Sequence, residues 1–313
     1  MIGRWALSSL LIGLAVVLSV ACGDGGADRS LRLDDRVDGV TVRRAPELDG
    51  TAGTLRIAIA GVMSPSRTLD AYDQLLSYLK TRLDMQITVD QRSSYAEVND
   101  LIRTGQADIA FVCSRAYLEG REQFGLQLFL APEVGGSLTY YSYLVVPAVS
   151  SATSLSDLRG KLFAFSDPLS NTGKLVPEYQ LLLRGETPNT FFRRYEYTGS
   201  HDNSILAVAD RLVDGAAVDS LVYDFIVQRN PEIGARTRVI ARWGPYGMPP
   251  LVVSPTLDVE LRGRLERALL EMDQDEDGLM ALAALGVDRF VPISDSAYDS
   301  IRAMVAALKA GER

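Results

Sequence analysis

The sequence predicts an α/β protein with two α/β lobes, a hinge between them and a cleft at their interface. Segments with the pattern of strands alternate with segments with the pattern of helices from Leu55 to Trp243, an order typical of parallel sheets with crossover helices. About 260 of the 313 residues follow Thr54, which is more than one simple core accommodates. The composition, 47% hydrophobic and 23% charged, is ordinary for a globular protein.

Residues 1–22 have the features of a secretory signal. Arg4 is the one charged residue before Asp24, and the apolar segment ALSSLLIGLAVVLSVA runs up to Cys22. A short basic segment, an apolar segment and small residues before a cleavage point define such a signal. The cysteine after LSVA favours a lipoprotein signal with Cys22 lipidated, although the leucine lies one place further from it than is usual. The alternative is a soluble secreted protein cleaved near Ala21.

Residues 23–53 are expected to be a flexible tether. This segment contains six glycines, no aromatic residue and charges of both signs. Such a composition buries too little apolar surface to fold. The tether would give a lipid-anchored domain reach from its membrane.

Residues 54–143 and 250–313 are expected to form the first lobe. Its strand segments are TLRIAIA, MQITVDQ and ADIAFVC, and its first helical segments are TLDAYDQLLSYLKTRL and YAEVNDLIRTG, whose apolar residues recur at helical spacing. Gly105 closes the second of these helices. The helical segments that follow PLVVS are expected to return and cover this lobe.

Residues 144–249 are expected to form the second lobe. The segment TYYSYLVVP leads into it, KLFAFS, RRYEYT, AAVDS and TRVIARW read as strands, and GKLVPEYQLLL and NSILAVADRLVDG read as helices. The chain is expected to cross between lobes near Tyr143–Pro147 and Trp243–Pro250. Ligands bind beyond the carboxyl ends of strands in such sheets, so the cleft should bind a small molecule by hinge closure.

Charge and composition exclude several classes of function. The formal net charge is −8 and no basic stripe occurs, so no nucleic-acid partner is expected. With a single histidine in the chain, a multi-histidine zinc site is impossible, and we expect neither a metal nor a cofactor. Cys113 ends the apolar segment DIAFVC and is expected to be a buried small hydrophobe, because Cys22 is the only other cysteine.

Small polar residues gather where the strand KLFAFS gives way to a helix. Ser170, Asn171, Thr172 and Gly173 stand at this point, and Pro177 supports a helix that begins near Thr172. The first amides of a helix lack internal partners and carry the positive end of its dipole, which makes them an anion site. The alternative is an ordinary N-cap formed by Ser170 or Thr172.

A second polar cluster follows the strand RRYEYT. It comprises Gly199, Ser200, His201, Asp202 and Asn203. His201 stands at a strand-to-helix turn, where the cleft is expected, and it could donate one or two hydrogen bonds to an oxyanion, depending on pH. A structural role is the alternative for a lone histidine.

Four stretches resemble the substrate-binding proteins of phosphate, phosphite and phosphonate ABC transporters. They are YAEVNDLIRTGQADIAFV, TYYSYLVV, SDPLSNTGKLVPEYQLL and GSHDNSILAVADRLVDGAAVDS, in the family's order. The resemblance implies a type II periplasmic-binding fold that clamps its ligand between lobes. It implies that the anion-cradling loop is Ser170, Asn171 and Thr172 with Gly173, that His201 is the pocket histidine, and that Tyr95 and Tyr140 reach the oxyanion from the other lobe.

The chain departs from the family pattern at two places. Many relatives have Ser-Thr-Ser-Gly where this chain has Ser-Asn-Thr-Gly, so the amide of Asn171 donates with a different geometry. Aminophosphonate binders carry a carboxylate just after the strand that here is AAVDS, where this chain has Ser220 and Leu221. A ligand without an amine is therefore favoured. If the nearby Asp219 reaches the ligand, it would accept a proton from phosphate or phosphite and repel fully ionised sulfate.

Two further motifs are set aside. The segment DQDEDG, Asp273 to Gly278, matches the first half of a calcium loop, but Ala284 stands where a bidentate glutamate is required, so an acidic turn is expected. A nucleophile triad of Ser170 or Ser200 with His201 is not expected, because Asp202 is adjacent in sequence and no G-x-S-x-G motif occurs.

We therefore expect an extracytoplasmic, lipid-anchored and monomeric solute-binding protein that captures a phosphorus oxyanion and passes it to an ABC permease and its ATPase. Because lobe closure is its mechanism, the chain is not expected to be an enzyme. Three alternatives remain: a binder of another small anion such as a sulfonate, an anion-sensing module of a membrane signalling system, and an enzyme acting on a phosphonate or ester.

Overall fold

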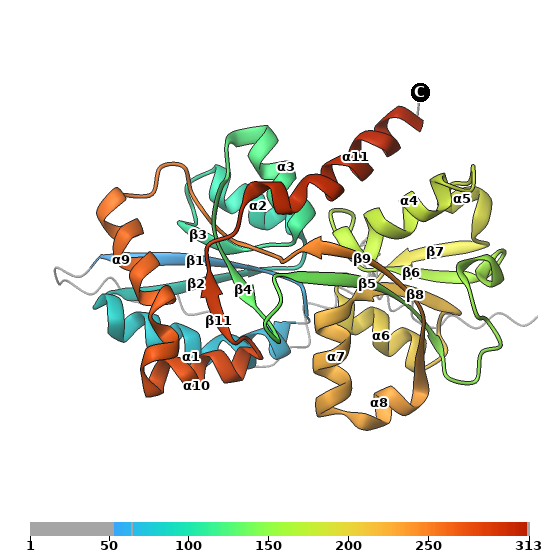
Figure 1. Ribbon diagram of the computed structural model, residues 1–313, viewed down its shortest axis with the longest axis horizontal. Coiled ribbons are helices and arrows are strands. Elements are labelled where there is room, and N and C mark those ends of the chain that lie inside the picture. The colour runs from blue at the N-terminus through green and yellow to red at the C-terminus, as the bar shows by residue number, and fades with distance from the viewer. Residues whose placement is uncertain (1–52, 64, 312–313) are drawn as a thin grey trace, which may run out of the picture. The chain divides into compact units, whose positions relative to one another are not determined.

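The computed structural model describes residues 53–63 and 65–311, without the side chains of residues 65–71 (Figure 1). The signal, the tether and the lipidation at Cys22 that the sequence predicts lie outside the described residues. The described chain forms two sheets with helices on their faces, which is the two-lobed α/β fold expected. None of the described helices combines the length and hydropathy needed to cross a bilayer.

The first lobe is built on a sheet of six strands in the order β11-β4-β10-β3-β1-β2. The strands are β1 (Thr54–Ala60), β2 (Gln86–Arg92), β3 (Ile109–Phe111), β4 (Gln127–Glu133), β10 (Leu251–Val253) and β11 (Arg289–Val291). β1 pairs in parallel with β2 and β3, whereas β10 and β11 join antiparallel from the C-terminal part of the chain. The interior strand β1 is buried on both faces, which explains its nearly continuous apolar sequence.

Helices cover both faces of this sheet. They are α1 (Pro65–Leu83), α2 (Tyr95–Arg103), α3 (Ser114–Phe124), α9 (Val259–Leu270) and α10 (Glu276–Leu285). On one face α1 packs with α9 and α10 in a single core that contains Leu79, Leu265 and Leu282. The expectation that C-terminal helices return to this lobe is therefore confirmed. On the other face, α2 begins with a capping box formed by Ser94 and Glu97.

The second lobe is built on a sheet of five strands in the order β7-β6-β8-β5-β9. The strands are β5 (Thr139–Pro147), β6 (Leu162–Phe165), β7 (Arg194–Tyr197), β8 (Gly215–Asp219) and β9 (Thr237–Gly247). β6 is parallel to β7 and β8, and β5 is antiparallel to β8 and β9. The helices are a π-helical turn (Asn171–Leu175) continued by α4 (Val176–Leu182), then α5 (Pro188–Phe191), α6 (His201–Ala209), α7 (Ser220–Arg229) and α8 (Pro231–Arg236).

The chain passes twice between the two sheets. The first passage lies between the end of β4 at Glu133 and the start of β5 at Thr139, and the second lies between Gly247 and Leu251. The sequence divided the lobes after residue 143, but β5 pairs with β9 from Thr139 onward. The whole of β5 therefore belongs to the second sheet, and its first residues stand at the junction of the lobes.

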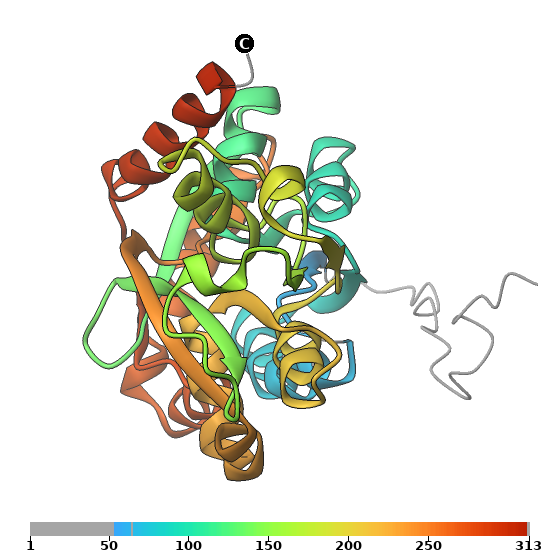
Figure 2. The same ribbon diagram turned by 90° about the vertical axis from the view of Figure 1, so that its right-hand side faces the viewer.

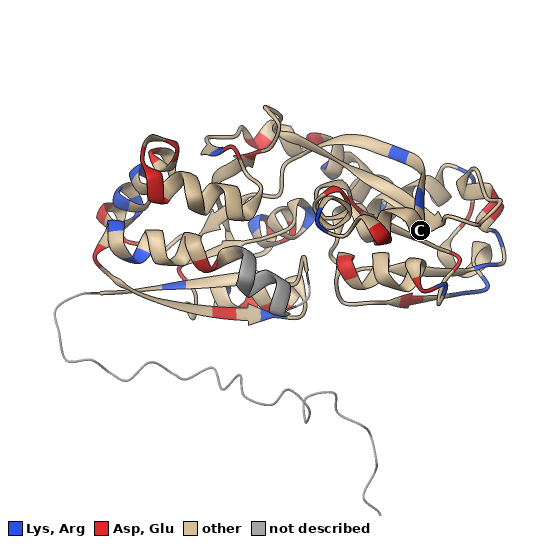
Figure 3. Cartoon of the chain, turned by 90° about the horizontal axis from the view of Figure 1, so that it is seen from below, with Lys and Arg blue, Asp and Glu red and all other residues tan. Residues whose placement is uncertain are grey.

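The last helix, α11 (Asp299–Gly311), contacts both lobes. Ile301 and Met304 of α11 lie in the same buried core as Tyr117 of α3 and as Leu175 and Val176, which lead into α4. Figures 1 and 2 show α11 lying over α3 and reaching toward α4. Acidic and basic residues are interspersed along the elements seen in Figure 3, with no basic stripe on that side.

Candidate anion-binding site

The loop after β6 forms a buried turn at the start of a helix. Ser170 is the N-cap residue, and its Oγ accepts a hydrogen bond from the N–H of Gly173 at 3.0 Å. The N–H of Leu175 donates to the carbonyl of Ser170 at 3.0 Å, so the first turn is the wider π-helical type. Ser170, Asn171 and Thr172 are almost fully buried. The polar cluster singled out in the sequence is thus an interior feature rather than an exposed helix cap.

Gly173 is required because other groups approach its Cα closely. A Cβ atom at this position would overlap Ser166 Oγ and lie 3.0 Å from His201 Cε1. The absence of a side chain at residue 173 therefore brings the loop against both Ser166 and His201. The site needs glycine for space.

His201 connects the two polar clusters of the second lobe. Its Nδ1 accepts a hydrogen bond from the backbone N–H of Asp219 at 3.1 Å, and its Nε2 lies 3.3 Å from Ser170 Oγ. Because Nδ1 is an acceptor, the hydrogen of the neutral ring is on Nε2, which donates to Ser170. Burial lowers the pKa of His201 to about 4. Near neutral pH His201 therefore has a single side-chain donor, Nε2, the lower of the two numbers of hydrogen bonds that the sequence allowed.

The hydroxyl of Ser170 is oriented by its two donors. A serine oxygen has two lone pairs and one hydrogen. In Ser170 the lone pairs accept from Gly173 N–H and His201 Nε2–H. The hydroxyl hydrogen is therefore left for a third group. This geometry makes Ser170 a donor prepared for an anion.

Tyr140 and Asn171 form a buried pair on the same lobe. The Nδ2 of Asn171 donates to Tyr140 Oη at 3.0 Å, and Ser114 Oγ lies 3.2 Å from the same hydroxyl. Ser114 also donates to the carbonyl of Gly247 at 2.8 Å. Tyr140 pairs with Tyr246 within the second sheet, so it does not come from the first lobe as the sequence suggested. The reason is that β5 starts five residues before the expected boundary.

Tyr95 and its neighbours bring the first lobe to the loop. Tyr95 is the first residue of α2, and its N–H donates to Asp167 Oδ2 at 3.3 Å. Burial is the main reason that the pKa of Tyr95 lies well above its usual value, and the neighbouring acidic groups of Cys113, Asp167 and Asp219 raise it further. The phenol is consequently a permanent donor. A second contact joins the lobes here, because Arg115 Nη1 donates to the carbonyl of Pro168 at 3.0 Å.

Cys113 is buried against the loop, as expected of a small hydrophobe. Its Sγ accepts a hydrogen bond from the N–H of Asn171 at 3.2 Å. Burial raises the pKa of the thiol to about 11, so it remains protonated and unreactive. Cys113 thus helps to hold the loop.

Asp219 ends β8 and caps α7. Its Oδ1 accepts from the N–H of Leu221 at 2.8 Å. Burial raises the pKa of Asp219 to about 7. Next to it, Ser220 Oγ accepts from the N–H of Tyr141 at 3.0 Å and so fixes β5 to α7. Thr172 is tied to the same sheet, because its carbonyl accepts from Ser142 Oγ at 2.7 Å.

Two buried polar atoms of the site have no hydrogen-bond partner in the described part of the chain. They are Ser166 Oγ, beside Gly173, and Asn171 Oδ1. Buried polar atoms are nearly always paired, so an unpaired one in a polar loop indicates a place for a ligand. The sequence analysis did not place Ser166, Asp167 or Ser114 in the site. Ser166 and Asp167 begin the stretch SDPLSNTGKLVPEYQLL that carries the family resemblance, whereas Ser114 lies outside all four stretches.

The described residues also bear on the two motifs set aside. Asp275 caps α10, accepting from Gly278 N–H at 2.7 Å, so DQDEDG forms the acidic turn that was expected. No group of three metal-ligating side chains occurs among the described residues. The Nδ1 of His201 accepts from a backbone amide, whereas a triad base donates this hydrogen to a carboxylate.

Two α/β lobes that meet around a buried, donor-rich loop define a periplasmic solute-binding protein. Residues 57–298 match the model of the family described as ABC transporter, phosphonate, periplasmic substrate-binding protein. The chain belongs to this family. Its members are substrate-binding transport proteins that act outside the cytoplasm, so the family, the type II fold and the role in an ABC importer predicted from the sequence are confirmed.

Individual relatives are distant but span most of the chain. The phosphate-import protein PhnD of Mycolicibacterium smegmatis is 24% identical over 81% of this chain and 85% of its own length. The phosphonates-binding periplasmic protein of Escherichia coli is 24% identical over 79% of this chain and 75% of its own length. PhnD1 of Prochlorococcus marinus, solved in complex with methylphosphonate, superposes with a TM-score of 0.74 at 18% identity, covering 82% of this chain and 98% of that protein.

Proposed function

We propose that this chain captures a phosphorus oxyanion, such as phosphate, phosphite or a phosphonate, and delivers it to an ABC permease and its ATPase. One observation carries the proposal. Both lone pairs of Ser170 Oγ are occupied by Gly173 N–H and His201 Nε2–H, so its hydroxyl hydrogen is available to an anion. The names of two relatives, a phosphate-import protein and a phosphonates-binding protein, support the choice of phosphorus.

The anion is held by donors from both lobes. Ser170, Thr172 and the first amides of the Asn171–Leu175 turn donate from the second lobe, since the first amides of a helix have no partner within it. Ser166 Oγ adds a donor that has no other partner among the described residues. The phenol of Tyr95 adds a donor from the first lobe, and Tyr140, whose hydroxyl is bonded to Asn171 and Ser114, holds Asn171 in place.

Closure of the lobes accompanies capture. The bonds from His201 N–H to the carbonyl of Val62, 3.1 Å, and from Tyr95 N–H to Asp167 link one lobe to the other. Each hydrogen bond to a charged group contributes about 1.5–3 kcal/mol. Several of them, offset by desolvation and closure, give binding on the order of −8 kcal/mol, which is micromolar.

The ligand keeps a proton in the bound state. The buried carboxyl of Asp219, with its pKa raised to about 7, and the unpaired Oδ1 of Asn171 are acceptors beside a site that otherwise donates. A P–OH group satisfies such an acceptor, whereas fully ionised sulfate has no hydrogen to offer. We therefore propose that Asn171 and Asp219 discriminate among anions. Ser220 has a structural role, because its bond to Tyr141 joins α7 to β5 beside the site.

The membrane attachment is part of the same proposal. Residues 1–22 direct export, Cys22 carries the lipid, and residues 23–53 act as the tether of a monomeric binding domain. Intact-mass measurement of the protein purified from membranes tests this, since lipidation and cleavage before Cys22 change the mass. Recovery of a soluble protein cleaved at another residue would refute the anchor but not the ligand.

Titration calorimetry tests the ligand. We expect heat with phosphate, phosphite and methylphosphonate, and none with sulfate or methanesulfonate. Ser170→Ala removes the prepared hydroxyl and lowers affinity about 10- to 100-fold, whereas Ser156→Ala, outside the site, is the matched control. Absence of heat with all three phosphorus anions at millimolar concentration refutes the proposal, and heat with a sulfonate alone favours that alternative.

A further inference from the structure

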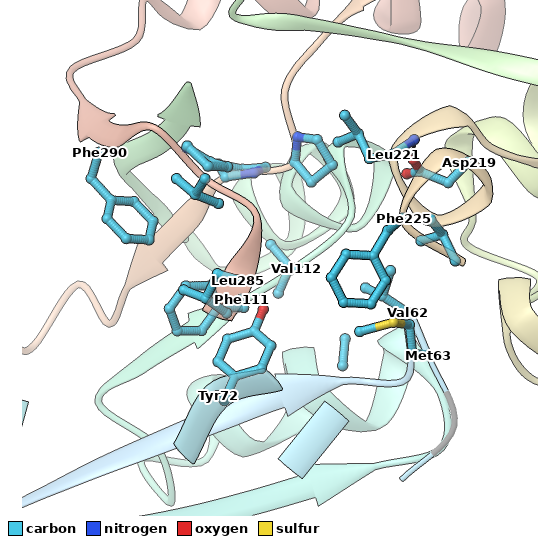
Figure 4. Close-up of a pocket in the computed structure, with 16 residues that line it drawn as sticks. Val62, Met63, Tyr72, Phe111, Val112, Asp219, Leu221, Phe225, Leu285 and Phe290 are labelled. Carbon is cyan, nitrogen blue, oxygen red and sulfur yellow. Dashed lines mark hydrogen bonds between the residues drawn. The ribbon is translucent and has the colours of Figure 1, made fainter. Parts of the chain in front are cut away.

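An apolar cavity lies beside the anion loop, between the two lobes. Its volume is about 160 Å³. Phe225 and Leu221 of α7 line it from the second lobe, and Tyr72, Phe111 and Phe290 line it from the first (Figure 4). The rings of Tyr72 and Phe111 pack edge to face at 4.8 Å, which gives this wall a fixed shape.

The cavity shares its wall with the anion loop. Val62 and Asp219 both line the cavity. Both are also bonded to His201, Val62 through its carbonyl at 3.1 Å and Asp219 through its N–H at 3.1 Å. Since the other ring nitrogen of His201 is bonded to Ser170, the cavity begins one residue away from the loop.

The cavity has no partner for a positive charge apart from Asp219. Asp219 is the one charged residue among the sixteen described residues that line it. The carboxyl of Asp219 already accepts from the N–H of Leu221 at 2.8 Å. An ammonium group in this cavity would lose its hydration to apolar walls, and it would compete with the N–H of Leu221 for the carboxyl of Asp219. Both effects make its binding unfavourable.

The volume suits a small hydrocarbon group. A dry protein cavity of about 150 Å³ lined by apolar side chains accepts benzene. The cavity here has about the same volume, 160 Å³, and similar walls. A propyl, butyl or phenyl group is therefore of a size that this pocket accommodates.

We infer that this cavity receives an apolar substituent carried by the phosphorus of the ligand, so the chain's preferred substrates are alkyl- or arylphosphonates. The inference rests on the proposed function, because the loop at Ser170 must hold the phosphonate group. It goes further in naming the substituent, which is a hydrocarbon group rather than an aminoalkyl group.

Calorimetry with matched ligands tests the inference. Propylphosphonate and 2-aminoethylphosphonate have nearly the same shape, but the second ends in an ammonium group. We expect propylphosphonate to bind about 15-fold more tightly than methylphosphonate, since each of its two additional methylenes contributes about fourfold. It should also bind at least about tenfold more tightly than the aminoethyl compound. The inference would be overturned if propylphosphonate bound no more tightly than methylphosphonate, or if 2-aminoethylphosphonate bound as tightly as propylphosphonate.

Variants of the cavity wall provide a second test. Leu285→Trp fills the cavity and should lower the phenyl-to-methyl affinity ratio about tenfold, while Phe225→Ala enlarges it and should shift the preference toward benzylphosphonate. Leu212→Trp, 68% exposed, is the control for an added tryptophan. Unchanged ratios in both folded wall variants overturn the inference. If methylphosphonate, phosphite and phosphate all fail to bind to the wild-type protein, the proposed function itself is refuted, and the assignment of the cavity with it.

Discussion

His201 accepts a hydrogen bond on Nδ1 from the backbone N–H of Asp219, 3.1 Å away. This bond fixes the tautomer of the ring and places a neutral imidazole beside a buried carboxyl group. The two groups titrate in opposite directions on folding. Burial lowers the pKa of His201 to about 4 and raises that of Asp219 to about 7.

The contributions of His201 and Asp219 to the pH dependence of stability should therefore largely cancel in the wild-type protein. The unfolded chain binds the extra proton at His201 between about pH 4 and 6.5, so this residue makes stability fall as pH decreases through that range. Asp219 binds its extra proton in the folded state between about pH 3.8 and 7, so it makes stability fall as pH increases. From about pH 4 to 6.5 the two slopes, each about 1.4 kcal/mol per pH unit, oppose each other.

Single variants should expose each slope. Relative to wild type, Asp219→Asn should lose stability by about 1–3 kcal/mol as the pH is lowered from 6.5 to 4.5. His201→Asn should gain relative stability over the same change. Urea unfolding at several pH values measures both, with the double variant as the reference. Parallel pH profiles for all four proteins would contradict the assignment.

Ligand affinity should also depend on Asp219. In the proposed complex Asp219 accepts a proton that the ligand carries. Above pH 7 both this carboxyl and phosphite are ionised, so affinity for phosphite should fall in wild type relative to Asp219→Asn. We expect the ratio of the two affinities to change by about tenfold between pH 6 and 8.5. A constant ratio across this range would show that Asp219 does not sense the ligand.

Gly173→Ala should abolish binding through a steric clash. The new methyl group overlaps Ser166 Oγ, and we expect a loss of about 1–3 kcal/mol in stability together with loss of ligand heat. Ser166→Gly in the same protein should restore part of the stability, because it removes the atom that clashes. Gly263→Ala in α9 is the control: its nearest neighbour is 3.8 Å away, so it should be neutral or stabilising by up to about 1 kcal/mol.

Asn171 and Tyr140 should prove to be energetically coupled. Tyr140→Phe removes the acceptor of Asn171 Nδ2 and leaves it buried without a partner, which costs about 1–3 kcal/mol. Asn171→Ala in the Tyr140→Phe background should cost less than it does alone, a coupling of about 0.5–2 kcal/mol in thermal or urea unfolding. Additive effects would mean that the 3.0 Å bond between them contributes nothing.

The fold was largely accessible from the sequence because its elements obey simple periodicities. The buried strands β1, β3 and β8 are short apolar segments bounded by polar residues, and α1 has a regular apolar face. The missed elements are α3, β4, the helices α5, α7 and α8, and the strand β11. The sequence of α3, SRAYLEGREQF, carries few apolar residues because the helix is covered on only part of its surface. β4 is followed by glycines rather than by a helix, and its antiparallel partner β10 lies more than a hundred residues later.

The site was accessible only in part. The loop at Ser170 and the turn at His201 have local signals, because each is a polar cluster that starts a helix. The tautomer of His201 depends on the backbone of Asp219, which is far away in sequence and joined only by the fold. Ser114 is likewise recognised only when Tyr140 and Gly247 are brought to it. The lobe that supplies Tyr140 depends on where a strand begins, which sequence patterns place least well.

The contacts of α11 have a practical consequence for experiments. A Cβ atom on Gly311, the last described residue, would lie 2.7 Å from Leu182 at the end of α4, so the last described turn of α11 lies against the second lobe. Hinge opening must separate this helix from α4 or from α3. A bulky affinity tag or fluorescent protein fused after this helix would hinder the movement of the lobes and so change the affinity being measured. The same position is well suited to a small environment-sensitive dye, whose emission would report capture of the anion in real time.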